Sequence, residues 1–477
     1  MCRNFLCVYI ITTSALSLGL SRRDQSSQTD MDAKQSKIRV LMLPWLAQGH
    51  ISPFLELANR LSKRNFHVYL CSTPINLSFI TKRLAAGDSS SSVESVELHL
   101  PYLPDLPPTR HTTNGLPPHL SPALKTAFDM AAPSFAAILQ NLAPDLLIYD
   151  FQAWPPAAAA SLNIPAVQFL TTAASAASVA HHISKFPEAE YPFPDLKLEQ
   201  SHAAQQFLNL VKANSNRKEG VMEAIERSCG IILYNTFREL EGKYIDYLST
   251  LSGKKIVPVG PLVQEIDAGS ENTEILKWLD EKESSSTVFV SFGSEFFPSK
   301  EDMEELAHGL EQSEVNFIWV IRFPAGEKAT AEEALPEGFS GKVGKRGLLV
   351  EGWAPQAKIL GHRSTGGFVT HCGWNSTLEA LSFGVPMVGV PMHLDQPVVA
   401  RMVAAAGVAV DVARGENGRL NREEIARGIR KVVVEENGEG IRDKAREFSD
   451  IIRRIGEEGV DEAADEFRRI CKERRSS

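Results

Sequence analysis

Short apolar runs alternate with amphipathic stretches along the chain from residue 37 onward. The apolar runs are rich in Val, Ile and Leu, which is typical of strands buried on both faces. They occur at 38–43, 67–71, 145–149, 166–170, 230–234 and 256–259. Stretches between them, such as 54–61 and 239–248, have the apolar spacing of helices. The pattern predicts an α/β fold with a parallel sheet covered by helices on both faces.

The alternation stops near 258–261, where the sequence is Pro-Val-Gly-Pro. A polar stretch follows, and an apolar run at 287–291 begins a second set of strands. We therefore expect two Rossmann-like domains that face a cleft, with the cleft as the default ligand site. The expected segments are an extension at 1–36, an N-terminal domain at 37–262, a linker at 263–286, a C-terminal domain at 287–455 and a C-terminal helix at 456–477.

The segment 353–396 carries the clearest candidate chemistry. An apolar run at 367–370 predicts a strand, the turn after it begins at His371, and a helix capped by Asn375 or Ser376 follows. A strand, a glycine turn and a helix start together direct free backbone N–H groups at one point. That point favours an anion such as pyrophosphate. The side chains of the same three residues add hydrogen-bond donors there.

Further polar and aromatic residues flank this turn at regular spacing. Glu379 lies one turn into the helix, where its carboxylate can accept from ribose hydroxyls, and Asp395 and Gln396 suit sugar hydroxyls. Trp353 and Gln356 offer a stacking face and an amide for uracil. Each residue alone also has a structural explanation, such as a capping Asn, a solvated Glu or a core Trp. The complete set at this spacing predicts a UDP-sugar site.

This segment resembles the plant secondary-product glycosyltransferase box of the family-1 UDP-glycosyltransferases, and the wider resemblance runs from about residue 31 to the C-terminus. It implies the GT-B fold, with the acceptor bound by the N-terminal domain, the UDP-sugar by the C-terminal domain, and the C-terminal helix packed back on the N-terminal domain. It implies UDP-glucose as co-substrate, because Gln at the final box position is associated with glucose. No metal or other cofactor is implied. Ala380 departs from the family, which more often has Ser there.

The resemblance also assigns a role to each donor-side residue, from uracil through ribose and diphosphate to the sugar. The residues implied to bind the UDP-sugar are Trp353, Ala354, Gln356, Glu379, His371, Gly373, Trp374, Asn375, Ser376, Asp395 and Gln396. Ser294, which follows the strand at 287–291, is implied to meet the phosphates or the donor sugar. A plain strand-to-helix turn is the alternative for that residue.

His50 and Asp150 are the candidate catalytic pair. His50 lies at the start of the first helix, whose N-terminus disfavours the imidazolium, so we expect a neutral ring that can take a proton from an acceptor hydroxyl. Asp150 follows the apolar run 145–149 at the same sheet edge, where it can fix the tautomer of His50. Either residue can instead cap a helix, but the family's His–Asp pair falls on these positions. We expect structural or surface roles for the other histidines considered, His67, His181 and His182.

The acceptor is the least constrained part of the prediction. Residues 101–122 are rich in Pro and predict a long loop. Within it 111–117, and beyond it 294–302, resemble the glycoside-branching subgroup, which adds a sugar to a sugar already attached to a terpenoid or flavonoid. We expect acceptor contacts from His111, Thr112 and Thr113, with a structural loop as the alternative. The predicted function is inverting β-1,6 or β-1,2 glucosylation of a triterpenoid glycoside.

Three other functions stay open at this point. The protein can glucosylate a flavonoid or terpenoid aglycone directly, or it can bind UDP-sugars without catalysis. A nucleotide-sugar epimerase or NAD-dependent oxidoreductase would also be α/β. Such an enzyme needs a G-x-G-x-x-G turn after an early strand, and 47–50 is Ala-Gln-Gly-His.

Composition narrows the partners and the compartment. The net charge of −9 makes a nucleic-acid partner unfavourable. The six cysteines are scattered without metal-binding spacing, so we expect reduced thiols, a cytoplasmic monomer and no metal. The apolar run 5–20 resembles a signal peptide or short anchor, but it is short for a membrane span and no A-x-A cleavage site follows. We favour an upstream extension over a targeting segment, and we expect no stable membrane insertion.

Overall fold

The structure is a computed structural model that describes residues 37–86, 92–198, 202–215, 221–264, 274–324, 329–412, 414–415 and 418–476. The predicted extension at 1–36 and part of the predicted linker lie outside these residues. Residues 38–477 cluster as one compact unit. None of the described helices is both long and apolar enough to cross a membrane.

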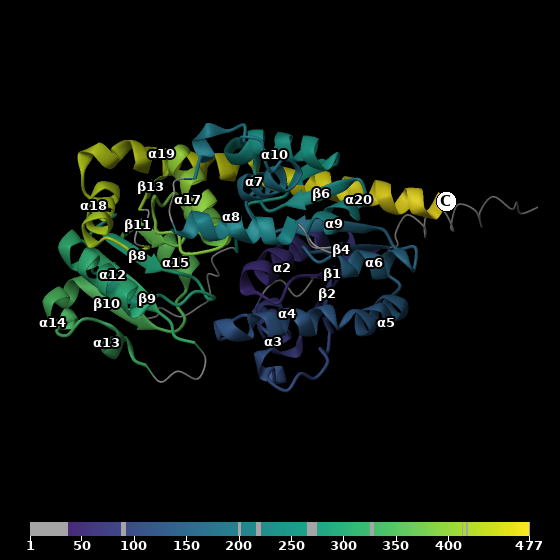
Figure 1. Ribbon diagram of the computed structural model, residues 1–477, viewed down its shortest axis with the longest axis horizontal. Helices are drawn as coiled ribbons and strands as arrows, with labels where there is room; N and C mark the ends of the chain where they lie inside the picture. The colour runs from purple at the N-terminus through teal and green to yellow at the C-terminus, as the bar shows by residue number, and fades with distance from the viewer. Residues whose placement is uncertain are drawn as a thin grey trace, which may run out of the picture. The chain divides into compact units, whose positions relative to one another are not determined.

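The first sheet has seven parallel strands in the order β3-β2-β1-β4-β5-β6-β7 (Figure 1). Val40 and Met42 of β1 pack with α2 and α20 on one face, whereas Leu41 and Leu43 pack with α4, α5 and α6 on the other. This alternation explains why inner strands such as β4 and β6 are apolar throughout. Strand bounds are β1 Ile38–Leu43, β2 Phe66–Ser72, β3 Val93–Glu97, β4 Leu146–Tyr149, β5 Ala166–Leu170, β6 Ile231–Tyr234 and β7 Lys255–Pro258.

Helices connect these strands and cover both faces of the first sheet. Their bounds are α2 Gln48–Ser62, α3 Pro74–Ala86, α4 Ser121–Asp129, α5 Ala132–Leu142, α6 Trp154–Ala160, α7 Ala174–Lys185, α8 His202–Ser215, α9 Val221–Glu226 and α10 Arg238–Ser252.

The second sheet has six parallel strands in the order β10-β9-β8-β11-β12-β13. Strand bounds are β8 Thr287–Ser291, β9 Asn316–Ile321, β10 Gly347–Glu351, β11 Thr365–Thr370, β12 Met387–Gly389 and β13 Ala409–Asp411. Helix bounds are α11 Glu274–Asp280, α12 Lys300–Ser313, α13 Ala331–Ala334, α14 Phe339–Val343, α15 Gln356–Leu360, α16 Trp374–Ser382, α17 Gln396–Ala405, α18 Arg422–Val433, α19 Glu439–Ile455 and α20 Glu458–Ser476.

The predicted α/β class with two Rossmann-like sheets is therefore confirmed, and so is the C-terminal helix that packs back. α20, yellow in Figure 1, adds Val460 and Phe467 to the core on one face of the first sheet. Arg64, in the turn after α2, forms ion pairs with Glu457 at 2.7 Å and with Asp461 at 2.6 Å. Burial of apolar side chains provides most of this attachment, because exposed ion pairs contribute little.

Local predictions agree with the structure to within a few residues at most element ends. The helix expected at 54–61 is an exception, because it begins at Gln48 and continues through Pro53. Ser299 caps α12, since its Oγ accepts from the backbone N–H of Asp302 at 3.2 Å.

Strand order fixes where a ligand site can form. In each sheet the order reverses between two adjacent strands, β1 and β4 in the first sheet and β8 and β11 in the second. The connections leave opposite faces of the sheet at such a point and open a crevice at the carboxyl ends of the strands. We call these the β1/β4 edge and the β8/β11 edge.

Candidate active site

Two side chains with acid–base chemistry meet at the β1/β4 edge. His50 lies in the first turn of α2, and Asp150 directly follows β4. Asp150 Oδ2 lies 2.6 Å from His50 Nδ1, and the Asp150 side chain is fully buried. The backbone N–H groups of Trp45 and Phe151 each donate to this carboxylate at 3.0 Å. The carboxylate is therefore held in place, and His50 Nε2 is the ring nitrogen left to accept a proton.

The pKa of His50 depends on more than the helix N-terminus. Burial lowers its pKa, but the charge and hydrogen bond of Asp150 raise it more, and Glu295 and Asp395 add to the effect, so that the net pKa is raised above 6.5. The helix N-terminus therefore does not decide the pKa of His50, because Asp150 has the larger effect. A buried carboxylate at hydrogen-bond distance outweighs the partial charge of a helix end. Thr171 Oγ1 also lies 3.0 Å from His50 Nδ1.

At the β8/β11 edge, α16 begins without a side-chain cap. Its N-cap residue is Gly373, which has no side chain to accept from the first backbone N–H groups. The prediction that Asn375 or Ser376 caps the helix was wrong, because the helix begins at Trp374 and both residues lie inside its first turn. The first backbone N–H groups of α16 therefore have no capping side chain, and a helix start of this kind favours an anion.

Asn375 instead bonds to the first helix of the other sheet. Its Nδ2 donates to the backbone oxygen of Gly49, and its Oδ1 accepts from Asn235 Nδ2 at 3.3 Å. Gly49 lacks its usual helical donor because Pro53, four residues later, has no N–H. Trp374 Nε1–H donates to the Asn235 backbone oxygen at 2.6 Å. Pro53 thus leaves the Gly49 carbonyl without a helical donor. The bond from Asn375 to this carbonyl connects the β8/β11 edge to the β1/β4 edge.

His371 is enclosed by glycines. A Cβ on Gly373 would lie 2.5 Å from His371 Nε2, and one on Gly293 would lie 3.0 Å from it. Burial lowers the pKa of His371 to about 3, with His393 adding to the effect. Its buried Nδ1 has no hydrogen-bond partner within the described part of the chain. A neutral imidazole with one unused nitrogen thus lies beside the open start of α16.

The predicted uracil and ribose residues lie together. Trp353 follows β10 and is 72% exposed, although it is a large apolar side chain. Gln356 Nε2 donates to Ser376 Oγ at 3.1 Å and to Glu379 Oε2 at 2.5 Å. Burial raises the pKa of Glu379, with Gln356 and Arg83 opposing it. The neighbouring Ala354 is buried, and its carbonyl accepts from the Gln356 N–H at 2.9 Å.

The predicted sugar residues already have protein partners. Asp395 Oδ2 accepts from Thr172 Oγ1 at 2.6 Å, which connects β12–α17 to β5–α7. Gln396 is 4% exposed, and its Oε1 accepts from the N–H groups of Met392 and His393 at 3.0 Å each. A sugar that binds Asp395 would compete with Thr172. The Gln396 amide nitrogen also lies 2.8 Å from His393 Nδ1, so the oxygen and the nitrogen of this side chain both have protein partners.

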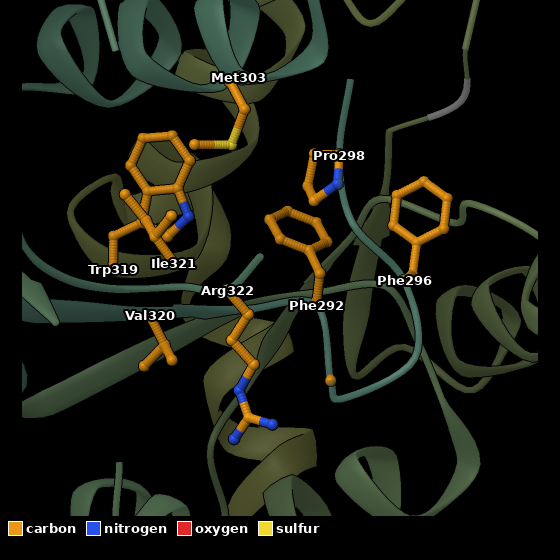
Figure 2. Close-up of a pocket in the computed structure, with 9 residues that line it drawn as sticks. Phe292, Phe296, Pro298, Met303, Trp319, Val320, Ile321 and Arg322 are labelled. Carbon is orange, nitrogen blue, oxygen red and sulfur yellow. The ribbon is translucent and has the colours of Figure 1, made fainter. Parts of the chain in front are cut away.

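Ser294 follows β8 beside Gly293. A small apolar pocket of about 10 Å³ lies next to these residues, lined by Phe292, Met303 and Trp319 among others. Figure 2 shows the guanidinium of Arg322 pointing away from Phe292 and Met303. Arg322 follows β9, its buried Nε has no partner in the described ranges, and burial lowers its pKa. No sequence motif indicated this half-buried cation.

A larger cavity of about 280 Å³ begins at the His50–Asp150 pair. Thr171, Thr172 and Asp395 line it near that pair. Most of its wall is apolar and comes from β5, α7, α8 and α9, namely Leu170, Ala176, Ala177, Ala180, Phe207, Leu210, Val211, Met222 and Ile225. None of these residues stands in a motif, so sequence reasoning missed the cavity.

The predicted acceptor residues do not line this cavity. His111 is 5% exposed, and its carbonyl accepts from Thr73 Oγ1 at 2.7 Å. Thr112 is buried, and Thr113 Oγ1 donates to Glu295 Oε1 at 2.6 Å. The structure therefore brings His50, Asp150 and Asp395 to one cavity, and His111, Thr112 and Thr113 are not among the residues that line it.

Two doubly wound parallel sheets, with an acid–base pair at one edge and an anion-binding helix start at the other, define a GT-B glycosyltransferase. Residues 36–264 match the family described as glycosyltransferase, N-terminal domain, and residues 265–443 match the UDP-glucoronosyl and UDP-glucosyl transferase family. The chain belongs to this family of UDP-glycosyltransferases.

Individual proteins support this membership. The chain is 54% identical to a mogroside IIIx synthase of Siraitia grosvenorii, over 91% of this chain and 98% of that protein. It is 48% identical to a beta-D-glucosyl crocetin beta-1,6-glucosyltransferase of Gardenia jasminoides, over 91% and 99%. A solved structure of a Phytolacca americana glycosyltransferase complexed with UDP-2fluoro-glucose and pterostilbene superposes with a TM-score of 0.72 at 30% identity, covering 90% of this chain and 99% of that one.

Proposed function

We propose that this enzyme transfers glucose from UDP-glucose, with inversion, to a hydroxyl of a sugar already attached to a triterpenoid, and that it forms a β-1,6 or β-1,2 linkage. One observation carries the proposal. The His50–Asp150 pair opens into a cavity whose near end is polar and whose remaining wall is mostly apolar. Asp395 of the UDP-sugar segment lines the same polar end.

The chemical step transfers one proton to His50 and one electron pair to the leaving UDP. His50 Nε2 takes the proton of the acceptor hydroxyl while that oxygen bonds to the anomeric carbon of glucose. The bond from that carbon to the β-phosphate oxygen breaks, and its electron pair leaves with UDP. Asp150 stabilises the imidazolium that forms, as the carboxylate of a Ser–His–Asp triad does. A single displacement from the α-linked donor gives a β-glucoside.

The leaving diphosphate receives its stabilisation at the β8/β11 edge. The N–H groups at the start of α16 point partial positive charge at it, and the neutral ring of His371 can donate one hydrogen bond. Ser294 at the end of β8 is our proposed third donor. We further propose that Trp353 stacks on uracil and that Glu379 holds the ribose, because the first is exposed and the second adjoins Gln356.

The division of the cavity favours a glycoside acceptor over a free aglycone. Thr171 and Thr172 provide hydroxyls beside His50, which suits a sugar, whereas the alanines of α7 and the side chains of α8 and α9 suit an apolar skeleton. The similarity to an enzyme named for β-1,6-glucosylation of a glucosyl crocetin supports transfer onto a sugar. The similarity to a mogroside IIIx synthase supports the predicted acceptor class.

The test is a transfer assay on matched acceptors. The purified full chain is supplied with UDP-glucose and either a triterpenoid monoglucoside or its aglycone, and products are identified by mass spectrometry and their linkage by NMR. Addition of one hexose to the glucoside in preference to the aglycone supports the proposal. Preference for the aglycone favours direct aglycone glucosylation. Absence of transfer to any acceptor, with UDP still bound, favours a binding protein.

We also propose that the enzyme is a monomer in the cytoplasm. The described cysteines, Cys71, Cys229, Cys372 and Cys471, are all free thiols, which fits a reducing compartment. Light scattering of the purified protein measures the mass, and imaging of a tagged full chain in plant cells measures the location. A dimeric mass or a membrane-bound signal would contradict the respective proposal.

A further inference from the structure

His181 lines the apolar cavity, and its contacts do not explain a role in folding. Its side chain is 3% exposed, and its buried Nδ1 has no hydrogen-bond partner in the described ranges. Buried polar atoms in native proteins are rarely left unpaired, because each costs about 1–3 kcal/mol. The sequence suggested only a structural or surface histidine at this position.

The next residue along the chain provides an internal comparison. His182 is also buried, but both of its ring nitrogens have partners. Its Nδ1 lies 2.6 Å from the Tyr247 hydroxyl, and its Nε2 lies 3.1 Å from the Ala189 carbonyl oxygen. His182 thus connects α7 to α10 and to the loop after α7. His181 faces the cavity on the same helix and lacks equivalent bonds.

The position of His181 on α7 gives its distance from the catalytic end of the cavity. α7 starts at Ala174, next to Thr172 at the catalytic end of the cavity, and His181 lies seven residues further on. At 1.5 Å per residue this is about 10 Å along the helix. The wall between these points includes Ala176, Ala177 and Ala180. The cavity therefore has polar groups beside His50 and again at His181, with apolar surface between them.

The protonation of His181 limits what it can bind. Burial, together with the charge of Lys185, lowers its pKa to about 4, so the ring is neutral near pH 7. A neutral imidazole has one N–H donor and one acceptor nitrogen. A hydroxyl also both donates and accepts, so it matches this group at both ring nitrogens.

We infer that His181 binds a hydroxyl on the aglycone of the acceptor, at the end of the apolar skeleton remote from the reacting sugar. The inference rests on the proposed function, and it narrows the acceptor to glycosides whose skeleton carries a polar group about 10 Å beyond the catalytic end of the cavity. Skeletons without that group leave the imidazole unpaired and bind less tightly.

The experiment measures binding, so that it does not depend on turnover. Calorimetry with UDP present compares two triterpenoid monoglucosides that differ only in the hydroxyl at the end opposite the glucose. We expect the wild-type protein to bind the hydroxylated compound about tenfold more tightly or better. His181→Leu should bind both compounds alike, and His181→Gln, which keeps a donor and an acceptor, should retain part of the difference.

Phe207→Leu is the matched control, because it trims the apolar wall of the same cavity without changing a hydrogen bond. This substitution should weaken the binding of both compounds equally. His181→Leu removes an unpaired polar group, so its thermal unfolding should not fall below that of the wild type. A wild type without preference, or a preference that survives in His181→Leu, would overturn the inference. A parallel transfer assay separates this result from failure of the proposed function, which would abolish transfer but leave the binding difference.

Discussion

The β1/β4 edge and the β8/β11 edge have the same topology, yet they carry opposite chemistry. Each presents a histidine near the strand end, His50 at one edge and His371 at the other. The pKa of His50 is raised and that of His371 is lowered to about 3. The difference comes from the neighbours. His50 has a buried carboxylate at 2.6 Å, whereas Gly293 and Gly373 enclose His371.

The comparison shows how one fold supplies two functions. Parallel sheets with a reversal in strand order provide a crevice, and the residue placed after the strand decides what the crevice does. In the proposed function, Asp150 makes the first crevice a proton-transfer site. Glycine and an uncapped helix in the second let backbone N–H groups approach a ligand closely. Each of the following variants changes a residue at one edge, and turnover or ligand binding is then measured to test the role of that edge.

His50→Ala gives the largest expected effect. Loss of the base should lower kcat/KM by about a thousandfold or more, because general base catalysis contributes up to about 10⁴-fold. The dissociation constant of UDP, measured by calorimetry, should stay within about twofold, since UDP is held at the other edge. His99→Ala, which changes a histidine that is exposed and away from the cavity, is the control. Substantial turnover in His50→Ala would exclude His50 as the base.

Asp150→Asn tests the cause of the raised His50 pKa. The base must be unprotonated, so kcat/KM should rise with pH through a value above 6.5 in the wild type. Without the carboxylate charge the pKa of His50 falls, and this acidic limb should move to lower pH. The plateau should fall by about a hundredfold or more, because the imidazolium loses its counter-charge. A pH–rate profile from pH 5 to 9 measures both effects, and an unmoved limb would contradict the assignment.

Trp353→Ala tests the β8/β11 edge with a smaller effect. Stacking of a base on an aromatic ring contributes about 1–3 kcal/mol, so the dissociation constant of UDP should rise about tenfold. The ring is 72% exposed, so thermal unfolding should change little. Tyr102→Ala, which removes an aromatic ring that is 79% exposed, serves as the control and should leave UDP binding unchanged. Equal UDP affinity in both variants would remove Trp353 from the uracil site.

Thr172→Val should have the smallest effect. It removes the hydrogen bond from Thr172 to Asp395 Oδ2 and leaves that oxygen for the donor sugar. Since one hydrogen bond contributes about 0.5–1.5 kcal/mol net, the KM for UDP-glucose should fall a few-fold. Binding of UDP, which has no sugar, should not change. If UDP and UDP-glucose responded equally, the proposed competition would be wrong.

The sequence predicted the fold and most of the cleft because those features depend on local patterns. Apolar runs at strand positions indicated both sheets, and the spacing from Trp353 to Gln396 brought the donor-side residues to one edge. The apolar spacing indicated the first helix only over 54–61, although His50 was placed at its start. Pro53 lies inside α2, and the Gly49 carbonyl, which its missing N–H leaves without a helical donor, accepts from Asn375 beside the other sheet.

The acceptor cavity could not be predicted in the same way. Its wall consists of alanine, leucine, valine and phenylalanine from helices that have no special pattern, and such residues fill most cores. The unpaired nitrogen of His181 is visible only when the surrounding contacts are known. The same holds for the contact of Thr172 with Asp395, which are far apart in sequence. Long-range packing, rather than local preference, determines these features.

The helix α20 bears on the order in which the molecule can fold during synthesis. Val460, Ala464 and Phe467 complete the core of the first sheet, although β7, the last strand of that sheet, ends at Pro258. The ribosome therefore makes the whole second sheet before the first can bury that face. Until then the nascent chain exposes apolar surface from β1 and α2, which is the kind of surface that chaperones bind.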